Sequence, residues 1–234
     1  MLILENISVE RSDLKIAADI TFNAGSTTAL MGPSGSGKST LLLAIAGFVS
    51  PTSGRILYMG KDITEAPPQK RPFEILFQDS NLFPHLTVEQ NLSLVFSTRM
   101  RPDREEKEKI ENILEKVGLS NRNRCKPGQL SGGQIARAAL ARLLLGDRPI
   151  ALLDEPFSSL GPSLRAEMID LTKKLLAHGN RALILVTHDP YDALLLNCDL
   201  VFVTEGKLSA PKNAKAVLSQ PGNALRNYLE PSKK

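Results

Sequence analysis

The segment Gly32–Ser39 has the clearest chemical potential in this chain, because its residue types and spacing suit a row of phosphate groups. It reads Gly32-Pro-Ser-Gly-Ser-Gly-Lys-Ser39, which fits the pattern G-x-x-x-x-G-K-[ST], and it directly follows an apolar run, Thr28–Met31. Gly35 and Gly37 carry no Cβ atom, so nearby backbone N–H groups can converge on phosphate oxygens at the positive end of a following helix. We therefore expect a phosphate-binding loop rather than an ordinary turn.

Two side chains at the end of this loop extend the prediction to a nucleotide and its metal ion. Lys38 is expected to neutralise the β and γ phosphates, and the hydroxyl of Ser39 to bind Mg²⁺, which prefers oxygen ligands. The candidate nucleotide contacts in this segment are Gly32, Pro33, Ser34, Gly35, Ser36, Gly37, Lys38, Ser39 and Thr40.

An acidic pair, Asp154 and Glu155, follows a second apolar run, Pro149–Leu153. Because the carboxyl ends of parallel strands meet at one edge of a sheet, we expect this pair beside the phosphate loop. Asp154 would then complete the magnesium site, and Glu155 would accept a proton from an attacking water molecule. An acidic pair after a strand is also common on ordinary surface loops, so this prediction depends on the phosphate loop.

The pentapeptide Leu130-Ser-Gly-Gly-Gln134 allows two readings that are compatible with each other. In the first it begins a helix, with Ser131 as the capping residue and Gln134 closing a capping box. In the second the exposed amides of Gly132 and Gly133 form another anion site at the helix end. The residues Ser131, Gly132, Gly133 and Gln134 are therefore candidate nucleotide contacts.

Short apolar runs alternate with helical patterns along the chain, which is typical of a mostly parallel sheet covered by helices. The expected strands are 27–31, 73–77, 149–153, 182–187 and 199–204. The stretch 82–146 is polar instead, with capping-box patterns at Thr87 and Ser131 and helix-ending glycines at Gly118 and Gly146. We read it as a helical lobe inserted into an α/β core.

Composition excludes several classes of protein. The 234 residues, 42% of them hydrophobic, allow one domain or one domain with an inserted lobe. An excess of 29 Lys and Arg over 25 Asp and Glu gives a net charge of +4, too mild a basic character for a nucleic-acid partner. Cys125 and Cys198 lack metal-ligand or disulfide spacing and are expected to be reduced thiols.

Neither a membrane span nor a secretory signal is expected. The apolar run Ala182–Val186 is far shorter than the roughly 18 residues that a span requires. Glu5 places a charge where a signal peptide needs an uninterrupted apolar stretch. We expect the protein to stay inside the cell.

Together with the phosphate loop, Leu130–Gln134 strongly resembles the signature of the ATP-binding subunits of ABC transporters. This resemblance implies an α/β fold of the P-loop NTPase (RecA-like) type: a mostly parallel sheet core, an antiparallel β portion and an inserted α-helical subdomain. The chain would be a single ABC ATP-binding domain, with residues 1–81 and 147–234 as the core and 82–146 as the subdomain that carries the signature.

The resemblance also assigns roles that spacing alone could not. Gln78 resembles the glutamine that senses Mg²⁺ and faces the membrane partner, and His188 resembles the histidine that binds the γ-phosphate and orients water with Glu155. An exposed glutamine or an incidental histidine after a strand would be the ordinary alternatives. The implied catalytic residues are Glu155, His188, Gln78 and Lys38, and the implied metal ligands are Ser39, Gln78 and Asp154.

The activity implied is ATP hydrolysis that drives a separate membrane permease. Two copies would pair head to tail around two ATP molecules, peripherally at the cytoplasmic face of the inner membrane, with a substrate-binding protein in the full system. Arg71–Gln78 and Asn81–Thr87 resemble most closely the ATPase subunit of bacterial thiamine importers. Iron, molybdate, polyamines and sugars stay open as cargo. A soluble ABC ATPase would need a long insertion or a second ATPase unit, which 234 residues do not contain.

Two departures from the family pattern affect specific expectations. Where relatives place an aromatic residue over adenine, this chain has Glu10-Arg-Ser-Asp13, and Arg11 is our candidate for stacking because its guanidinium is planar. An ordinary solvated arginine is the alternative. Where relatives have Ser-Ala-Leu-Asp, this chain has Ser158-Ser-Leu-Gly161, so the aspartate expected to link the two ATP sites is absent.

Overall fold

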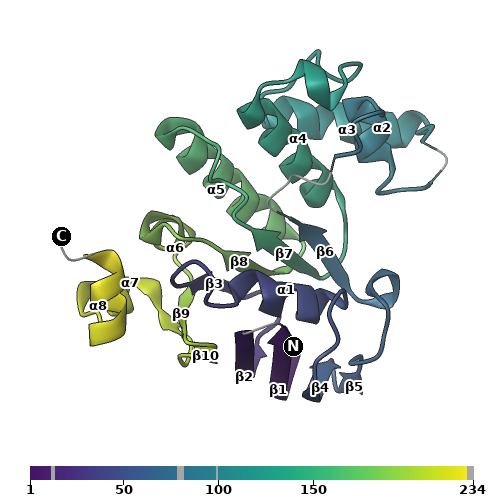
Figure 1. The fold of residues 1–234 in the computed structure, drawn as a ribbon. Helices are drawn as coiled ribbons and strands as arrows, with labels where there is room; N and C mark the ends of the chain where they lie inside the picture. The colour runs from purple at the N-terminus through teal and green to yellow at the C-terminus, as the bar shows by residue number, and fades with distance from the viewer. Residues whose placement is uncertain (12–13, 78–81, 99, 231–234) are drawn as a thin grey trace.

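A single sheet runs through the part of the chain that the computed structural model describes, residues 1–11, 14–77, 82–98 and 100–230 (Figure 1). The strand order is β5-β4-β1-β2-β10-β9-β3-β8-β7-β6, and β11 pairs with β9. The strand bounds are β1 Leu2–Arg11, β2 Leu14–Phe22, β3 Thr27–Met31, β4 Ser53–Tyr58, β5 Lys61–Asp62, β6 Phe73–Leu76, β7 Ile150–Asp154, β8 Ala182–Val186, β9 Asp199–Thr204, β10 Lys207–Leu208 and β11 Lys212–Asn213.

The predicted fold class is confirmed. The strands β9, β3, β8, β7 and β6 are parallel neighbours, and β1, β2, β4 and β5 form the antiparallel portion. All five predicted strands exist, with ends that differ by at most one residue from the expected ranges. Consequently the carboxyl ends of β3, β7 and β8 lie at the same edge of the sheet, where ligands bind in open α/β folds.

The central parallel strands β7 and β8 are buried on both faces, which explains why they read as apolar runs. Along β7, Ala151 and Leu153 belong to one hydrophobic core, and Ile150 and Leu152 to the other. The second core also contains side chains of the helix Lys38–Ala46 (α1) and of the antiparallel strands, whereas the first contains side chains of the later helices, α2 to α8. Helix α1, which follows the phosphate loop, therefore packs between the parallel and the antiparallel parts of the sheet.

Eight α-helices are present in the described residues. Their bounds are α1 Lys38–Ala46, α2 Val88–Ser93, α3 Arg104–Lys116, α4 Gly132–Leu145, α5 Pro162–His178, α6 Pro190–Leu196, α7 Ala214–Ser219 and α8 Asn223–Leu229. Helices α2, α3 and α4 pack against one another at one end of the molecule (Figure 1). The capping boxes predicted at Thr87 and Ser131 are both formed. The boundaries of the lobe, 82 and 146, stay a prediction.

The two predicted helix-ending glycines behave differently. Gly118 follows α3 with a left-handed backbone, φ 66°, and its N–H bonds to the carbonyl of Glu115, as expected. Gly146 also ends its helix, α4, as expected, but its backbone is extended rather than left-handed. The buried guanidinium of Arg181 donates to the carbonyls of Leu143 and Gly146 and satisfies this helix end.

Among the described residues, no helix combines the length and the apolar character needed to cross a bilayer. Both cysteines are free. Burial raises the pKa of the Cys198 thiol to about 12, so that this thiol stays neutral at physiological pH.

Candidate functional site

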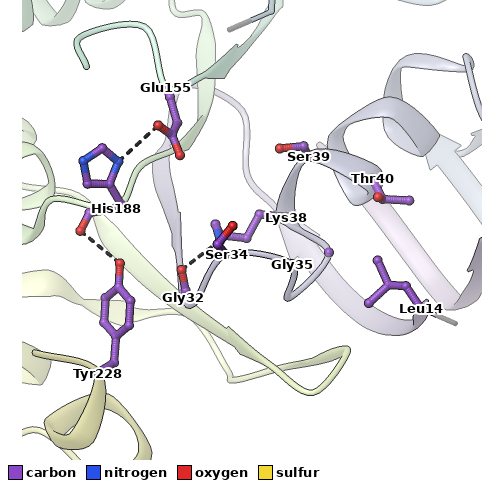
Figure 2. A pocket seen from close by; sticks show the side chains of 11 residues that line it. Leu14, Gly32, Ser34, Gly35, Lys38, Ser39, Thr40, Glu155, His188 and Tyr228 are labelled. Atoms are coloured by element: carbon purple, nitrogen blue, oxygen red, sulfur yellow. Dashed lines mark hydrogen bonds and ion pairs between the residues drawn. The ribbon is translucent and has the colours of Figure 1, made fainter. Parts of the chain in front are cut away.

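A cleft of about 420 Å³ lies at the carboxyl edge of the parallel strands (Figure 2). It is bordered by the phosphate loop between β3 and α1, by the residues that follow β7 and β8, and by α8 near the C-terminus. The lining residues are Leu14, Gly32, Ser34, Gly35, Gly37, Lys38, Ser39, Thr40, Glu155, His188 and Tyr228. The structure thus brings together most of the predicted phosphate contacts and three of the predicted catalytic residues, Lys38, Glu155 and His188.

The backbone of the loop explains why glycine occupies two of its positions. Gly35 has φ 76° and Gly37 has φ 102°, both in the left-handed region that L-residues with side chains rarely adopt. A Cβ atom on Gly37 would also lie 2.6 Å from the side chain of Ile16 on β2. Gly37 is the residue before α1, so its conformation sets the angle at which this helix points its N–H groups into the cleft.

Lys38 is folded against the loop that carries it. Its ammonium group donates to the carbonyls of Gly32 at 2.8 Å and Pro33 at 2.7 Å, and to the hydroxyl of Ser36 at 3.3 Å. Burial lowers the pKa of Lys38, and the nearby carboxylate of Glu155 opposes this shift. These bonds hold the positive charge within the loop, beside the cleft (Figure 2).

Ser39 and Asp154 connect α1 to the end of β7. The hydroxyl of Ser39 donates to Oδ1 of Asp154 at 3.1 Å, and Asp154 is buried. Burial raises the pKa of Asp154, an effect that the hydrogen bond from Ser39 reduces. The two predicted metal ligands that the structure describes are therefore in contact. The third, Gln78, lies outside the described residues.

Glu155 and His188 lie side by side in the cleft, with their side chains in contact (Figure 2). Oε2 of Glu155 lies 3.1 Å from Nδ1 of His188, within hydrogen-bonding distance. Glu155 adopts a left-handed backbone, φ 49°, which is strained for a residue with a side chain. Its N–H bonds to the carbonyl of Val186 on β8, and its carbonyl accepts the hydroxyl of Ser158. These contacts fix the direction of the carboxylate.

The side chains of the residues before and after His188 contact an ion pair between Arg165 and the buried carboxylate of Asp192. Asp192 accepts two bonds from the guanidinium of Arg165, at 2.7 and 2.8 Å, and one from the hydroxyl of Thr187 at 2.6 Å. The same guanidinium lies 2.9 Å from the carboxylate of Asp189. Arg165 belongs to α5, so this helix positions the residues before and after His188.

The segment Ser131–Gln134 does not reach this cleft. It begins α4, where Ser131 Oγ accepts the N–H of Gln134 and Oε1 of Gln134 accepts the N–H of Ser131. Ser131 and Gly132 are exposed, and Gly133 and Gln134 are half-buried. Within one chain the structure therefore separates these predicted contacts from the phosphate loop.

Arg11 is placed next to the cleft but does not line it. It is exposed at the end of β1 and pairs across the sheet with Leu14, whose side chain does line the cleft. Directly opposite residues in an antiparallel pair project to the same face, so Arg11 and Leu14 share a face. Leu14 is a site residue that the sequence prediction missed, because an apolar residue on a strand carries no sign that it lines a cleft.

Tyr228 is the second residue that the sequence prediction missed. It lies on α8, and its hydroxyl donates to the carbonyl of His188 at 3.0 Å (Figure 2). No local pattern in the sequence points to this contact, because the two residues are 40 positions apart.

Comparison with known proteins identifies close relatives. The sequence profile described as ABC transporter matches residues 17–158. The thiamine import ATP-binding protein ThiQ of Cereibacter sphaeroides is 47% identical, over 99% of this chain and 100% of that protein. The ThiQ protein of Ruegeria sp. is 44% identical, over 98% of this chain and 99% of that protein.

Solved structures agree with the sequence comparison. The ADP conformation of MJ1267, an ATP-binding cassette of an ABC transporter, gives a TM-score of 0.82 at 28% identity, over 98% of both chains. The dimeric structure of MJ0796, a bacterial ABC transporter cassette, gives 0.80 at 28% identity, over 92% of this chain and 99% of that one. Matched by the profile over more than half its length and by close relatives from end to end, the chain belongs to the ABC transporter family.

Proposed function

We propose that this chain is the ATP-hydrolysing subunit of a thiamine importer and drives a separate membrane permease. Its cleft carries the proposal, because the phosphate loop, Glu155 and His188 line one cavity and Glu155 contacts His188 at 3.1 Å. Thiamine as cargo is supported by the names of relatives that are 44–47% identical over nearly the whole chain.

The phosphate loop would hold the triphosphate of ATP. The N–H groups around Gly35 and Gly37, at the start of α1, would bind the phosphate oxygens. Lys38 would exchange its bonds to the carbonyls of Gly32 and Pro33 for bonds to the β and γ phosphates, which carry more negative charge. The hydrogen bonds to the loop therefore hold the ammonium group of Lys38 close to the proposed position of the phosphates.

Glu155 would act as the general base. It would accept a proton from a water molecule whose oxygen attacks the γ-phosphorus, while the bond between that phosphorus and the departing ADP oxygen breaks. His188, whose neighbours in the chain both contact the ion pair, would bind the γ-phosphate and orient the water together with Glu155. The ion pair of Arg165 and Asp192 would keep the imidazole in place.

The residues at the edge of β7 fit a magnesium ion. The Ser39 hydroxyl and the Asp154 carboxylate offer hard oxygen ligands 3.1 Å apart, and substrate phosphates commonly supply others. Gln78, outside the described residues, is the third proposed ligand. When bound, Mg²⁺ would neutralise charge on the phosphate oxygens and so favour attack at phosphorus.

A head-to-tail pair of chains would complete each site. Ser131–Gln134 is exposed at the start of α4, away from the cleft of its own chain, and a helix start with free N–H groups attracts phosphate. A second copy could therefore place this segment against the γ-phosphate. The dimeric form of the similar cassette MJ0796 supports this arrangement.

Exposed aromatic side chains of Phe48 and Phe83 would receive the permease at the cytoplasmic face of the inner membrane. Phe48 and Phe83 are 53% and 47% exposed, and the ring of Phe48 contacts that of Phe77 at 5.4 Å. Phe77 and Phe83 come shortly before and after the stretch 78–81 in the sequence. Large exposed apolar side chains commonly mark such contact sites. A substrate-binding protein would deliver the cargo.

Uptake into proteoliposomes tests the proposal. The full chain is assembled with its permease and substrate-binding protein, and labelled thiamine is followed with and without MgATP. We expect ATP-dependent accumulation of thiamine and faster ATP hydrolysis in its presence. ATP hydrolysis coupled to uptake of iron, molybdate or a polyamine, but not thiamine, would contradict thiamine as the cargo and leave the proposed ATPase activity standing. Absence of ATP hydrolysis would contradict the whole proposal.

A further inference from the structure

Tyr228 connects the C-terminal helix α8 to the catalytic cleft. Its side chain lines the cleft together with Glu155 and His188, and its hydroxyl donates to the carbonyl of His188 at 3.0 Å (Figure 2). The hydroxyl hydrogen is used by this bond. Tyr228 therefore acts on the backbone of His188 and leaves the imidazole free for Glu155.

The ring of Tyr228 is held in place independently of this bond. It packs against Phe202 on β9 with ring centroids 5.7 Å apart and an interplanar angle of 57°, and Phe202 is buried. On the same helix Leu225 is buried in the core. These two contacts hold α8 against the sheet and so fix the position of the Tyr228 hydroxyl.

The bond from Tyr228 completes the set of anchors around His188. The preceding residue, Thr187, is bound to Asp192, and the following residue, Asp189, is paired with Arg165. The Tyr228 bond, in contrast, is made to the backbone carbonyl of His188 itself. We propose that Tyr228 is a positioning residue for ATP hydrolysis, whose hydroxyl holds the His188 backbone so that the imidazole stays against Glu155.

This inference rests on the catalytic role proposed above for His188, and the chemistry of the hydroxyl agrees with it. Burial, and then the charges of Glu155 and Asp189, raise the pKa of Tyr228. The hydroxyl consequently keeps its proton at neutral pH and remains a donor to the carbonyl.

The substitution Tyr228→Phe tests the inference, because it removes the hydroxyl and retains the ring that packs on Phe202. The loss of one neutral hydrogen bond predicts a fall in kcat of about 2- to 10-fold. The KM and Kd for ATP should change by less than about two-fold because the phosphate loop is untouched, and Tm should fall by at most about 6 °C because the ring contact is retained. Tyr58→Phe and Tyr191→Phe are matched controls outside the cleft and should match the wild type.

A double variant tests whether Tyr228 acts through His188. In a His188→Ala background, measured by single turnover so that slow hydrolysis is still followed, Tyr228→Phe should cause less than about a 1.5-fold further loss. An undiminished second loss would overturn the inference, as would wild-type kcat in Tyr228→Phe alone. A parallel fall of kcat, ATP affinity and Tm in Tyr228→Phe would show a structural role and also overturn it. Wild-type hydrolysis by His188→Ala would instead contradict the role proposed for His188.

Discussion

At the residue scale, Glu155 combines a strained backbone with a proposed chemical role. Its φ of 49° costs a residue with a side chain about 1–2 kcal/mol relative to glycine, whereas glycine loses about 0.5–1 kcal/mol of additional entropy on folding. Strain retained at such a position is consistent with a requirement for the carboxylate rather than for stability.

The substitution Glu155→Gly should therefore stabilise the fold while it removes the proposed base. We expect the free energy of unfolding to rise by about 0.5–1 kcal/mol, measured by urea denaturation, with ATP hydrolysis almost abolished. Glu205→Gly is the matched control, because Glu205 has φ 48° in the turn before β10 and does not line the cleft. It should gain similar stability and keep its activity. A loss of stability in Glu155→Gly would contradict the strain argument.

The base of ATP has two candidate contacts, Arg11 and Leu14. If the Arg11 guanidinium stacks on adenine, Arg11→Ala should weaken ATP binding by about 1 kcal/mol and leave pyrophosphate binding unchanged. Leu14→Ala should weaken ATP binding as well, because Leu14 lines the cleft. Calorimetric titration with both ligands measures the difference. Equal ATP affinity of Arg11→Ala and the wild type would mean that Arg11 is a solvated surface residue.

At the element scale, one buried arginine anchors the phosphate-loop helix. The guanidinium of Arg71 donates to the carbonyls of Ala44 and Ile45 at the end of α1, and to those of Thr64 and Ala66. Only 2% of Arg71 is exposed. The helix that carries Lys38 and Ser39 is thus fixed at the end opposite to the cleft.

Replacing Arg71 with methionine should leave these carbonyls without their donor and destabilise the fold by about 2–4 kcal/mol. Arg55→Met is the matched control, since the Arg55 side chain is 62% exposed and makes a surface ion pair with Glu5. The control should change stability by less than about 1 kcal/mol. Urea denaturation of both variants measures the difference in the free energy of unfolding. Equal effects would show that the buried hydrogen bonds of Arg71 stabilise the fold no more than a surface ion pair does.

The parallel strands could be predicted from the sequence, whereas the antiparallel strands could not be placed. Both faces of β7 and β8 are buried, so each strand reads as an apolar run. On β2 every second residue, from Lys15 to Thr21, is exposed, and this breaks the run. The end of α4 was predicted correctly at Gly146, but the donor that satisfies it, Arg181, comes from a distant part of the chain and could not be predicted.

The residues of the candidate site also fall into two groups, those that local sequence predicts and those that it misses. The phosphate loop and the pair Asp154 and Glu155 are local patterns, because the residues that each function needs are consecutive in the sequence. Leu14 and Tyr228 reach the cleft only through tertiary packing, and a leucine or tyrosine has no chemical signature of its own. Local sequence therefore predicts the groups that would act on phosphate and misses those that support them.

At the scale of the whole molecule, Gly161 bears on how the two sites of a dimer communicate. It is the residue before α5, with an ordinary φ of −65°, and an added Cβ would meet nothing within 4 Å. An aspartate therefore fits, but it would also cap α5 and so stabilise the helix. Asparagine caps equally well without the negative charge, which makes Gly161→Asn the matched control.

We expect both sites to hydrolyse ATP with a Hill coefficient near 1 in the wild type, because the inter-site carboxylate is absent. Gly161→Asp should raise the coefficient on the assembled transporter, and Gly161→Asn should not, since coupling of about 1–3 kcal/mol would come from the charge. Strong cooperativity in the wild type, unaltered by either substitution, would mean that Ser158 or Ser159 already supplies the contact.

The rate of ATP hydrolysis by Glu155→Gln tests the central claim most directly. Glutamine keeps the shape of the side chain and removes the base. The account predicts ATP binding within about two-fold of the wild type, a fall in turnover of about 10²- to 10⁴-fold, and accumulation of a stable ATP-bound dimer. Turnover equal to that of the wild type would contradict the assignment of Glu155 as the catalytic base of this ATPase.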